Sequence, residues 1–591
     1  MKRWGVISKA VFMKFIKSPE FIAAFCFVVF LALGIVSNIT IENVVYAQGG
    51  MAEEVSLPFS REIEANTPFT MEFDIVNRYG LSYDMWIIPD DCADSVTVGK
   101  ETLDLGGVRG HCDFSKGFLL TDSALAPLQQ GENTHYSISM HNGGGPGGMM
   151  AFVKMTSVVG EIVKILAMVS FTLLVVLVAR RLRLGKPLVM LLFIGILFRC
   201  FFFMATPYKK FSMDVEGHIE YVQYILENHS IPNETDCWSC YHPPVYYVAA
   251  APSYALSEFL GMPGTTGLQA FSLLLSVVTT FLGLLFLKKI LQGRPLLLAS
   301  ILWIFWPLMI MVAPRIGNDQ MFYMLHVLCM WAGIYYVKGG RGRYLMLALV
   351  STALALWTKS TAVVTLGMFF VFAVCGLFTN DRFLNLTKSE VISWMLFVVL
   401  VAVFAFQTLH GPELVGNAHS LNSAMKVQNE TYNYLYFDLK NFLESPFTSC
   451  WNSHMGRDFF WNFVLKTSLF GEWSLLENAN GRFWATIMSV LLLGLLVYGA
   501  RDFWKTRFNL VHWILLLQGV AFIAALMALR VKYAYACSSD FRYILPVLLS
   551  FCPFVAIGAT MKGSSVMWKV VGHVIIMGFV VSSSVLYIMV M

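Results

Sequence analysis

The feature that most constrains this fold is a series of apolar runs long enough to cross a membrane. Such runs, each of roughly 20 residues, recur along the 591-residue chain and are separated by short loops rich in Lys and Arg. Only 13% of the residues are charged, about half the share of a soluble protein. The sequence therefore predicts a polytopic α-helical membrane protein. The net charge of +5 lies mostly in the basic loops, so it does not indicate a nucleic-acid partner.

The basic loops also predict how the chain is oriented, because cytoplasmic loops are enriched in Lys and Arg. Lys2, Arg3, Lys9, Lys14 and Lys17 place the N-terminus in the cytoplasm. The charge rule then agrees at every turn if the segment 244–260 does not cross but forms an interfacial or re-entrant helix. About thirteen spans result: a retained anchor at 21–37, then 158–179, 187–205, 268–287, 296–313, 321–337, 344–358, 361–378, 392–408, 484–500, 510–529, 543–560 and 570–590.

The segments between the spans indicate the domain organisation. Alternating apolar residues at 69–75 and 136–140, with turn formers around them, predict a small extracytoplasmic β-sandwich of the jelly-roll type near the N-terminus. This domain either binds carbohydrate or only packs on the membrane core. The predicted order is a tail and anchor (1–40), the β-sandwich (41–155), a second transmembrane helix with a basic loop (156–186), a transmembrane core (187–408) with a first outer loop (206–267), a large outer loop (409–482) and C-terminal transmembrane helices (483–591).

The eleven cysteines divide by location. Cys92 and Cys112 lie together in the β-domain outside the cell membrane, where disulfides persist, and are expected to bond to each other. Cys237-Trp-Ser-Cys240 lies in the first outer loop and is interpreted as a structural bridge, with Cys450 and Cys537 as alternative partners. A redox or metal-binding role is less favoured, because no second pair or His tract has a zinc spacing.

The most informative polar stretch is Asp214-Val-Glu-Gly-His218, followed by His242 in Tyr241-His-Pro-Pro. If the first stretch is a short helix, Asp214 and His218 share one face and Glu216 lies on another. Asp214 then sits near the start of a helix on the membrane surface. There its carboxylate is ionised and can act as a base.

Other polar residues fall at the predicted outer ends of distant helices. Any one of them can be an ordinary interfacial anchor, but together they can line one cavity with Asp214. A carboxylate base beside several cations suits an anionic, lipid-linked substrate whose phosphate is the leaving group. Arg199, about two turns from the outer end of its span, could extend toward the headgroups. The residues of the predicted shared cavity are Asp214, His242, Arg315, Asn318, Asp319, Lys359 and Arg542.

These residues carry a resemblance to a known family. Asp-x-x-Gly-His at 214–218 and His-Pro-Pro-x-Tyr-Tyr at 242–247 resemble the GT-C superfamily of polyprenyl-phosphate-sugar-dependent glycosyltransferases, in the branch of protein O-mannosyltransferases and aminoarabinose transferases. Asn318-Asp319, Thr358-Lys359, the stretch 466–472 and Arg542-Tyr543 are similar to later landmarks of that branch. The resemblance covers about 187–560.

The resemblance implies a GT-C-like catalytic core and transfer of a sugar from undecaprenyl- or dolichyl-phosphate to a glycan, lipid or protein acceptor, with inversion. Asp214 would be the general base. Lys359 and Arg542 would hold the phosphate with help from His242 or Arg315. Membrane lipids are the surrounding partners. The residues that the resemblance places in substrate binding are Glu216, His218, His242, Arg315, Asn318, Asp319, Lys359 and Arg542.

Three other functions stay open at this stage. A lipid-linked glycan transporter or flippase would be expected to show internal repeats and mid-span charges, which the sequence scarcely has. A glycan polymerase or ligase differs in donor size rather than chemistry, and a scaffold would use the β-domain alone. No motif indicates a cofactor, and a divalent metal is possible but not indicated. The active site is expected on the extracytoplasmic side of the bacterial inner (plasma) membrane or of the eukaryotic endoplasmic reticulum.

Overall fold

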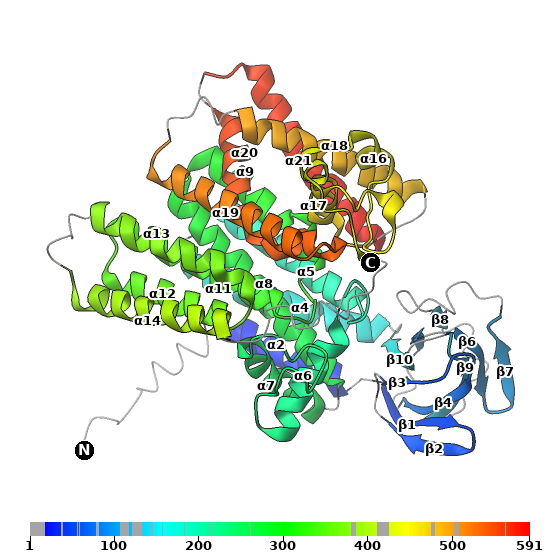
Figure 1. The fold of residues 1–591 in the computed structure, drawn as a ribbon. Coiled ribbons are helices and arrows are strands. Elements are labelled where there is room, and N and C mark those ends of the chain that lie inside the picture. Colours follow the sequence, from blue (N-terminus) through cyan, green and yellow to red (C-terminus); the bar gives the residue numbers. More distant parts are fainter. Residues whose placement is uncertain are drawn as a thin grey trace, which may run out of the picture. The chain divides into compact units, whose positions relative to one another are not determined.

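The computed structural model of the chain describes residues 18–36, 39–55, 57, 59–77, 82–90, 92–106, 118–120, 133–143, 146–155, 158–181, 184–212, 214–260, 262–379, 386–410, 425–473, 479–501, 508–561 and 563–590. It divides into two compact units (Figure 1). The first comprises Met1–Val178 with Ser257–Pro263, and the second Ala179–Leu256 with Gly264–Met591.

The first unit contains ten strands in two antiparallel sheets, as far as its described residues go. One sheet has the order β2-β1-β4-β9-β6-β7 and the other β3-β10-β5-β8 (Figure 1). The strands are β1 (Thr40–Gln48), β2 (Met51–Glu54), β3 (Phe59–Glu62), β4 (Pro68–Val76), β5 (Tyr83–Pro89), β6 (Cys92–Val98), β7 (Glu101–Asp104), β8 (Phe118–Leu120), β9 (Asn133–His141) and β10 (Pro146–Met155).

The sandwich follows from strict alternation along its strands. In β4 the apolar residues Phe69, Met71, Phe73 and Ile75 are buried, while the polar residues between them point outward. Opposite them, Tyr136 pairs in register with Phe73. These side chains share one apolar core with buried residues of β5 and β10 in the second sheet. The two sheets therefore pack face to face, which confirms the predicted β-domain.

The predicted bond between Cys92 and Cys112 and the choice between the two roles of the β-domain stay predictions. Cys112 lies outside the described residues, and no observation of the strands bears on carbohydrate binding.

Two helices complete the first unit: α2 (Pro19–Val36) and α4 (Val158–Arg181), which continues into the second. α2 coincides with the predicted anchor, and its Phe27 ring lies 5.5 Å from that of Phe171 in α4.

The second unit is helical. Its central helix, α11, packs against α8, α12 and α13. Its helices are α5 (Lys186–Ala205), α6 (Val215–Asn228), α7 (Val245–Phe259), α8 (Gly264–Ile290), α9 (Gly293–Phe305), α10 (Pro307–Met311), α11 (Asp319–Val337), α12 (Gly342–Leu356), η1 (Ser360–Ala362), α13 (Val363–Thr379), α14 (Lys388–His410), α15 (Thr431–Leu435), α16 (Leu439–Glu444), η3 (Ser453–Met455), α17 (Phe460–Phe470), α18 (Ala479–Arg501), α19 (Leu510–Lys532), η5 (Ala536–Ser539), η6 (Phe541–Val547), α20 (Leu548–Thr560) and α21 (Val566–Val590).

Within the described residues, nine helices are long and apolar enough to cross a membrane, and three shorter apolar helices accompany them. The prediction of a multi-pass helical protein is thereby confirmed. One predicted span, 296–313, is split into α9 and α10, because Trp306 adopts an extended conformation ahead of Pro307. The segment 244–260, expected not to cross, forms α7.

The expectation that Arg199 extends toward the headgroups is wrong. Its side chain is completely buried inside the second unit. Nη1 donates to the carbonyl of Gly195 at 2.9 Å and Nε to Ser276 Oγ at 3.3 Å. Burial removes Arg199 from solvent, so polar groups of α5 and α8 take its place as hydrogen-bond partners.

Candidate active site

Asp214 occupies a special backbone position at the start of α6. It is the N-cap residue with φ 55° and ψ 23°, in the left-handed region that Asp tolerates better than most residues. Its carboxylate makes no capping hydrogen bond to α6, and the residue is exposed. The carboxylate therefore stays available at a helix N-terminus, where a negative charge is favoured.

A disulfide loop packs against the first turn of α6. Cys237 and Cys240 are bonded to each other, and the backbone N–H of His242 donates to the carbonyl of Ser239 at 3.0 Å. A Cβ on Gly217 would lie 2.5 Å from Ser239 Oγ and 2.6 Å from Trp238 Cδ1. Only glycine allows this close approach, so Gly217 and the disulfide together fix His242 beside α6.

The two histidines of the motif belong to an aromatic stack. His218 Nδ1 is 2.7 Å from the hydroxyl of Tyr247, and the rings of His218 and His242 lie 5.5 Å apart and nearly parallel. Tyr221 stacks on Tyr247 at 3.8 Å. Burial lowers the pKa of His218 to about 3, and the charges of Arg315 and Lys359 add to this effect.

The pKa of His242 is also lowered. Burial, with the neighbouring His218 and Lys359, holds its pKa well below the ordinary value. Both imidazoles are therefore neutral near pH 7. They can offer hydrogen bonds to a substrate, but they add no positive charge to the site.

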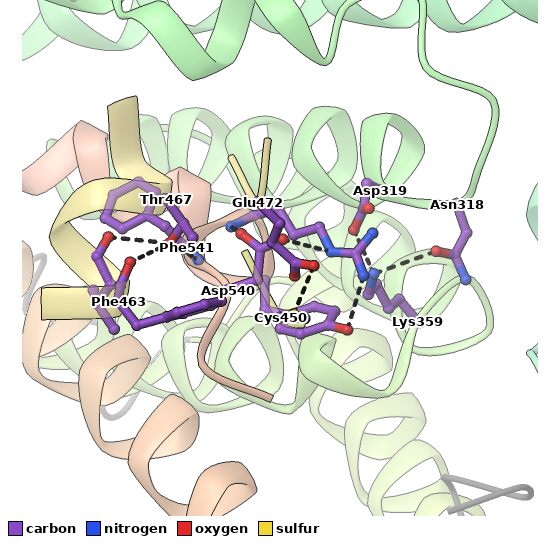
Figure 2. A network of polar contacts seen from close by, with 12 residues as sticks. Asn318, Asp319, Lys359, Cys450, Phe463, Thr467, Glu472, Asp540 and Phe541 are labelled. Carbon is purple, nitrogen blue, oxygen red and sulfur yellow. Dashed lines mark hydrogen bonds and ion pairs between the residues drawn. The ribbon is translucent and has the colours of Figure 1, made fainter. Parts of the chain in front are cut away.

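A buried ion pair joins the start of α11 to the break after α12 (Figure 2). Lys359 Nζ donates to Asp319 Oδ1 and, at 3.4 Å, to Asn318 Oδ1. Asn318 Nδ2 in turn donates to the carbonyl of Thr358 at 3.2 Å. Burial lowers the pKa of Lys359, and the charge of Asp319 opposes that shift. The network fixes the lysine head group at the junction of two helices.

A second buried cation lies in η6. Arg542 Nε is 3.0 Å from Asp540 Oδ2, and Arg542 Nη2 donates to the hydroxyl of Tyr543 at 3.2 Å. Lys359 Nζ lies 4.8 Å from the centre of the Tyr543 ring. Tyr543 therefore stands between the two cations and brings η6 next to the Asp319 and Lys359 pair.

Glu472 and Cys450 extend this network into the large outer loop (Figure 2). The thiol of Cys450 donates to Glu472 Oε2 at 2.9 Å. Burial and the nearby charge of Asp540 raise the pKa of Glu472 well above its ordinary value. Burial therefore disfavours the charged form of the Glu472 carboxyl.

Three buried cations lie close to one another among these described groups. Arg315, Lys359 and Arg542 are all buried; Lys359 pairs with Asp319 and Arg542 with Asp540, and the charge of Arg542 acts on Arg315. Gathering like charges away from water is costly unless anions accompany them. The cluster is therefore suited to an anionic group such as a phosphate.

The structure brings together most of the predicted residues, all within the second unit. Asn318, Asp319, Lys359 and Arg542 form the network, and His218 and His242 form the stack. The charge of Asp214 acts on His242 and Arg315, and the guanidinium of Arg315 lies 5.5 Å from the centre of the Trp473 ring. Glu216 differs: it is exposed and pairs with Lys209 at 3.1 Å.

Sequence reasoning missed Asp540, Tyr543 and Tyr247 as site residues, and it used Glu472 only as a landmark. Asp540 and Tyr543 flank Arg542, so a search for a carboxylate beside each predicted cation would have found Asp540. Lys466, another landmark, instead donates to Asn441 Oδ1 and the carbonyl of Met455, each at 2.8 Å. Among the described residues, no group of three or more His, Cys, Asp and Glu is arranged to hold a metal ion.

The helical unit thus gathers acid, imidazole and cationic residues at the ends of its helices. Residues 241–407 match the family model described as dolichyl-phosphate-mannose-protein mannosyltransferase. The matched stretch includes His242, Arg315, Asn318, Asp319 and Lys359. The predicted resemblance to the GT-C superfamily of glycosyltransferases is thereby confirmed. No curated protein sequence matches the chain.

Solved structures of low sequence identity were also found. The oligosaccharyltransferase AglB from Archaeoglobus fulgidus, in complex with an inhibitory peptide and a dolichol-phosphate, is 10% identical, with a TM-score of 0.39, over 68% of this chain and 55% of that one. The apo oligosaccharyltransferase from Archaeoglobus fulgidus is 11% identical over the same shares, with a TM-score of 0.40. The arabinosyltransferase EmbB from Mycobacterium smegmatis is 11% identical, with a TM-score of 0.28, over 96% of this chain and 64% of that one. The chain therefore spans less than two thirds of each of these proteins.

Proposed function

We propose that this protein is an integral membrane glycosyltransferase that transfers a hexose or pentose from a polyprenyl-phosphate donor to an acceptor on the extracytoplasmic side. The observation that supports it most is the cluster of three buried cations, Arg315, Lys359 and Arg542, whose charges act on one another beside Asp214. A lipid-linked phosphate would bind to these cations, and its sugar would then lie toward the exposed carboxylate. The basic loops between the spans support the extracytoplasmic assignment.

In the proposed reaction, Asp214 accepts the proton of an acceptor hydroxyl. The hydroxyl oxygen attacks the anomeric carbon as the bond between that carbon and the phosphate oxygen breaks. Attack from the side opposite the phosphate inverts the configuration at the anomeric carbon. The leaving polyprenyl phosphate carries away the bonding electrons, and Asp214 keeps the proton until it exchanges with water.

The buried groups have separate tasks in this proposal. Lys359 and Arg542 bind the phosphate and stabilise the charge that develops on it, with Arg315 assisting. Asp319 and Asp540 hold the two cations in position. The neutral imidazoles of His218 and His242 donate hydrogen bonds to sugar hydroxyls or to phosphate oxygens, since both stay uncharged near pH 7.

The family description names dolichyl-phosphate mannose, so polyprenyl-phosphate mannose is the first donor to test. The purified protein, in vesicles containing this lipid with a labelled sugar, is incubated with a membrane extract as the source of acceptor. We expect a labelled product and one released polyprenyl phosphate for each sugar transferred.

Two results would replace the proposal. If the lipid donor moves between the leaflets while its sugar stays attached, the protein is a flippase. If only a diphosphate-linked glycan is consumed and every monophosphate-linked sugar is left intact, it is a glycan polymerase or ligase.

A further inference from the structure

We propose that Cys450 and Cys537 form a second disulfide, a covalent link between the large outer loop and the segment that carries Arg542. Both cysteines are free thiols in the structure. Their thiols are hydrogen-bond neighbours, although they are far apart in sequence. Cys450 also belongs to an apolar cluster with Phe463 and Ala536, on which Cys537 packs. The link goes beyond the proposed transfer and does not depend on it.

The backbone already holds the two segments side by side. The N–H of Val427 donates to the carbonyl of Ala534 at 3.0 Å, and Lys426 forms an isolated antiparallel bridge with Tyr535. The guanidinium of Arg530 donates to the carbonyl of Gln428 at 3.1 Å. The two segments are therefore already in place before a disulfide between Cys450 and Cys537 forms. Forming the bond would cost the folded protein little conformational entropy.

The surroundings of Cys537 place it in an environment where disulfides persist. Cys537 interacts electrostatically with Tyr241, which follows directly on the bonded Cys240, and with Asp214. Cys537 and the disulfide loop therefore lie at the same end of the second unit. A compartment that keeps Cys237 and Cys240 oxidised also allows a second pair to be oxidised.

The reaction is a thiol–disulfide exchange with a low-molecular-weight disulfide or an oxidising protein disulfide. Cys537 is only partly buried, so its thiolate attacks the oxidant and releases one thiolate. The thiolate of Cys450 then attacks Sγ of Cys537, forms the bond between the two residues and releases the second thiolate. The two protons lost by the cysteines are taken up by the two leaving thiolates, and the oxidant gains the two electrons.

Formation of this bond would change the candidate active site in one definite way. Cys450 donates its thiol hydrogen to Glu472 in the free form. The disulfide has no such hydrogen, so Glu472 would lose this donor. Because Glu472 is also hydrogen-bonded to Asp540, the partner of Arg542, the link would connect the oxidation state of the outer loop to the cation cluster.

The test uses the full-length protein purified in detergent. It is treated with oxidised glutathione, denatured, alkylated with a maleimide, digested and analysed by mass spectrometry without reductant. We expect a linked peptide pair containing Cys450 and Cys537, and its loss, with both residues alkylated, after treatment with a dithiol reductant. Cys329 and Cys552, which are buried in α11 and α20, should be alkylated in every sample.

A Cys537→Ser variant should lose the linked pair, whereas Cys552→Ser should keep it. The peptide containing Cys237 and Cys240 serves as the internal control for oxidation, because it must stay linked before reduction. The proposal is overturned if that control is linked while Cys450 and Cys537 are both alkylated, or if either of them is linked to another cysteine. The wild-type protein alone decides this, so a variant that fails to fold does not affect the result.

Discussion

The β-sandwich and the helical unit use the same residue types in opposite ways. In the sandwich, His135 Nδ1 lies 2.8 Å from Asp74 Oδ1, and His141 pairs with Asp94 at the same distance, all on surfaces open to solvent. In the helical unit, His218, Asp319 and Lys359 are less than a tenth exposed. Alternation along a strand places every second side chain in water, whereas helix ends that meet in a bundle enclose their polar residues.

The difference matters because burial changes what a charge costs. An exposed ion pair contributes about 0–1 kcal/mol to stability. Removing a buried ion pair from water costs about as much free energy as the attraction between its charges returns. Apolar residues in the same place would therefore often make the protein equally stable. Buried charges at Asp319, Lys359 and Arg542 are therefore better explained by function than by stability, while the pairs on the sandwich need no such explanation.

The largest expected effect is a difference in transfer rate between a carboxylate variant in the helical unit and one in the sandwich. Asp214→Asn keeps the size of the side chain and removes the proposed base, so transfer should fall by roughly 10²–10⁴-fold. Asp74→Asn, on the sandwich, should leave transfer unchanged. The measurement is initial rate with the purified lipid donor, together with donor affinity, which should survive in Asp214→Asn because the change removes a negative charge near a phosphate.

A different pattern would move the base to another carboxylate. Near-normal transfer in Asp214→Asn, with activity abolished in Glu216→Gln or Asp319→Asn, would assign the base to one of those residues. Normal transfer in all three variants would end the proposed mechanism.

The second prediction compares the ion pairs of the two units by stability. Lys359→Ala leaves Asp319 buried without its partner, which should cost about 3–5 kcal/mol. It should also weaken donor binding, since Lys359 is assigned to the phosphate. Arg61→Ala, in an exposed pair with Glu53 at 2.9 Å, should cost no more than about 1 kcal/mol.

Thermal unfolding in detergent and equilibrium binding of the lipid donor measure the two parts of this prediction. Equal losses of stability in Lys359→Ala and Arg61→Ala would mean that the Asp319 pair is solvated. Undiminished donor binding in Lys359→Ala would remove that residue from the phosphate site.

The third prediction concerns the packing that positions the motif. Gly217→Ala forces a Cβ to within 2.6 Å of the disulfide loop, so it should cost about 1–3 kcal/mol and lower transfer. Gly367→Ala is the matched control, because a Cβ there has no neighbour within 4 Å. It should be neutral or slightly stabilising, since Ala is the better helix former. Thermal midpoints that fall equally in both variants would refute the packing argument.

The elements that depend on local sequence pattern could be predicted from the sequence. Span length and loop charge predicted the helices, and alternation at Phe69–Ile75 predicted the strand β4. The clustering of Asp319, Lys359 and Arg542 was also predictable, since residues at the same ends of packed helices lie near each other. These inferences use only periodicity, length and the membrane side, which a sequence carries directly.

Contacts that depend on how helices pack were beyond this reasoning. Nothing local distinguishes Arg199, held by Ser276 across a helix interface, from an arginine that reaches the headgroups. The pairing of Glu216 with Lys209 rather than with the cation cluster depends on the backbone turn at Asp214. The raised pKa of Glu472 depends on burial and on the charge of Asp540, which is distant in sequence.

The smallest expected effect uses pH to test whether the buried histidine of the helical unit is neutral. The pKa of His218 is about 3 in the folded protein against 6.5 when unfolded, because burial disfavours the charged form. Between these values the unfolded chain binds one more proton than the folded protein, so stability falls as pH decreases below 6.5. From pH 7 to pH 5.5, His218 should account for a loss of about 1 kcal/mol. His218→Asn removes this contribution, so its thermal midpoint should depend less on pH than that of the wild type over this interval. Parallel curves for the two proteins would mean that His218 gains a proton as readily when folded as when unfolded, and the neutral imidazole assigned to the site would have to be abandoned.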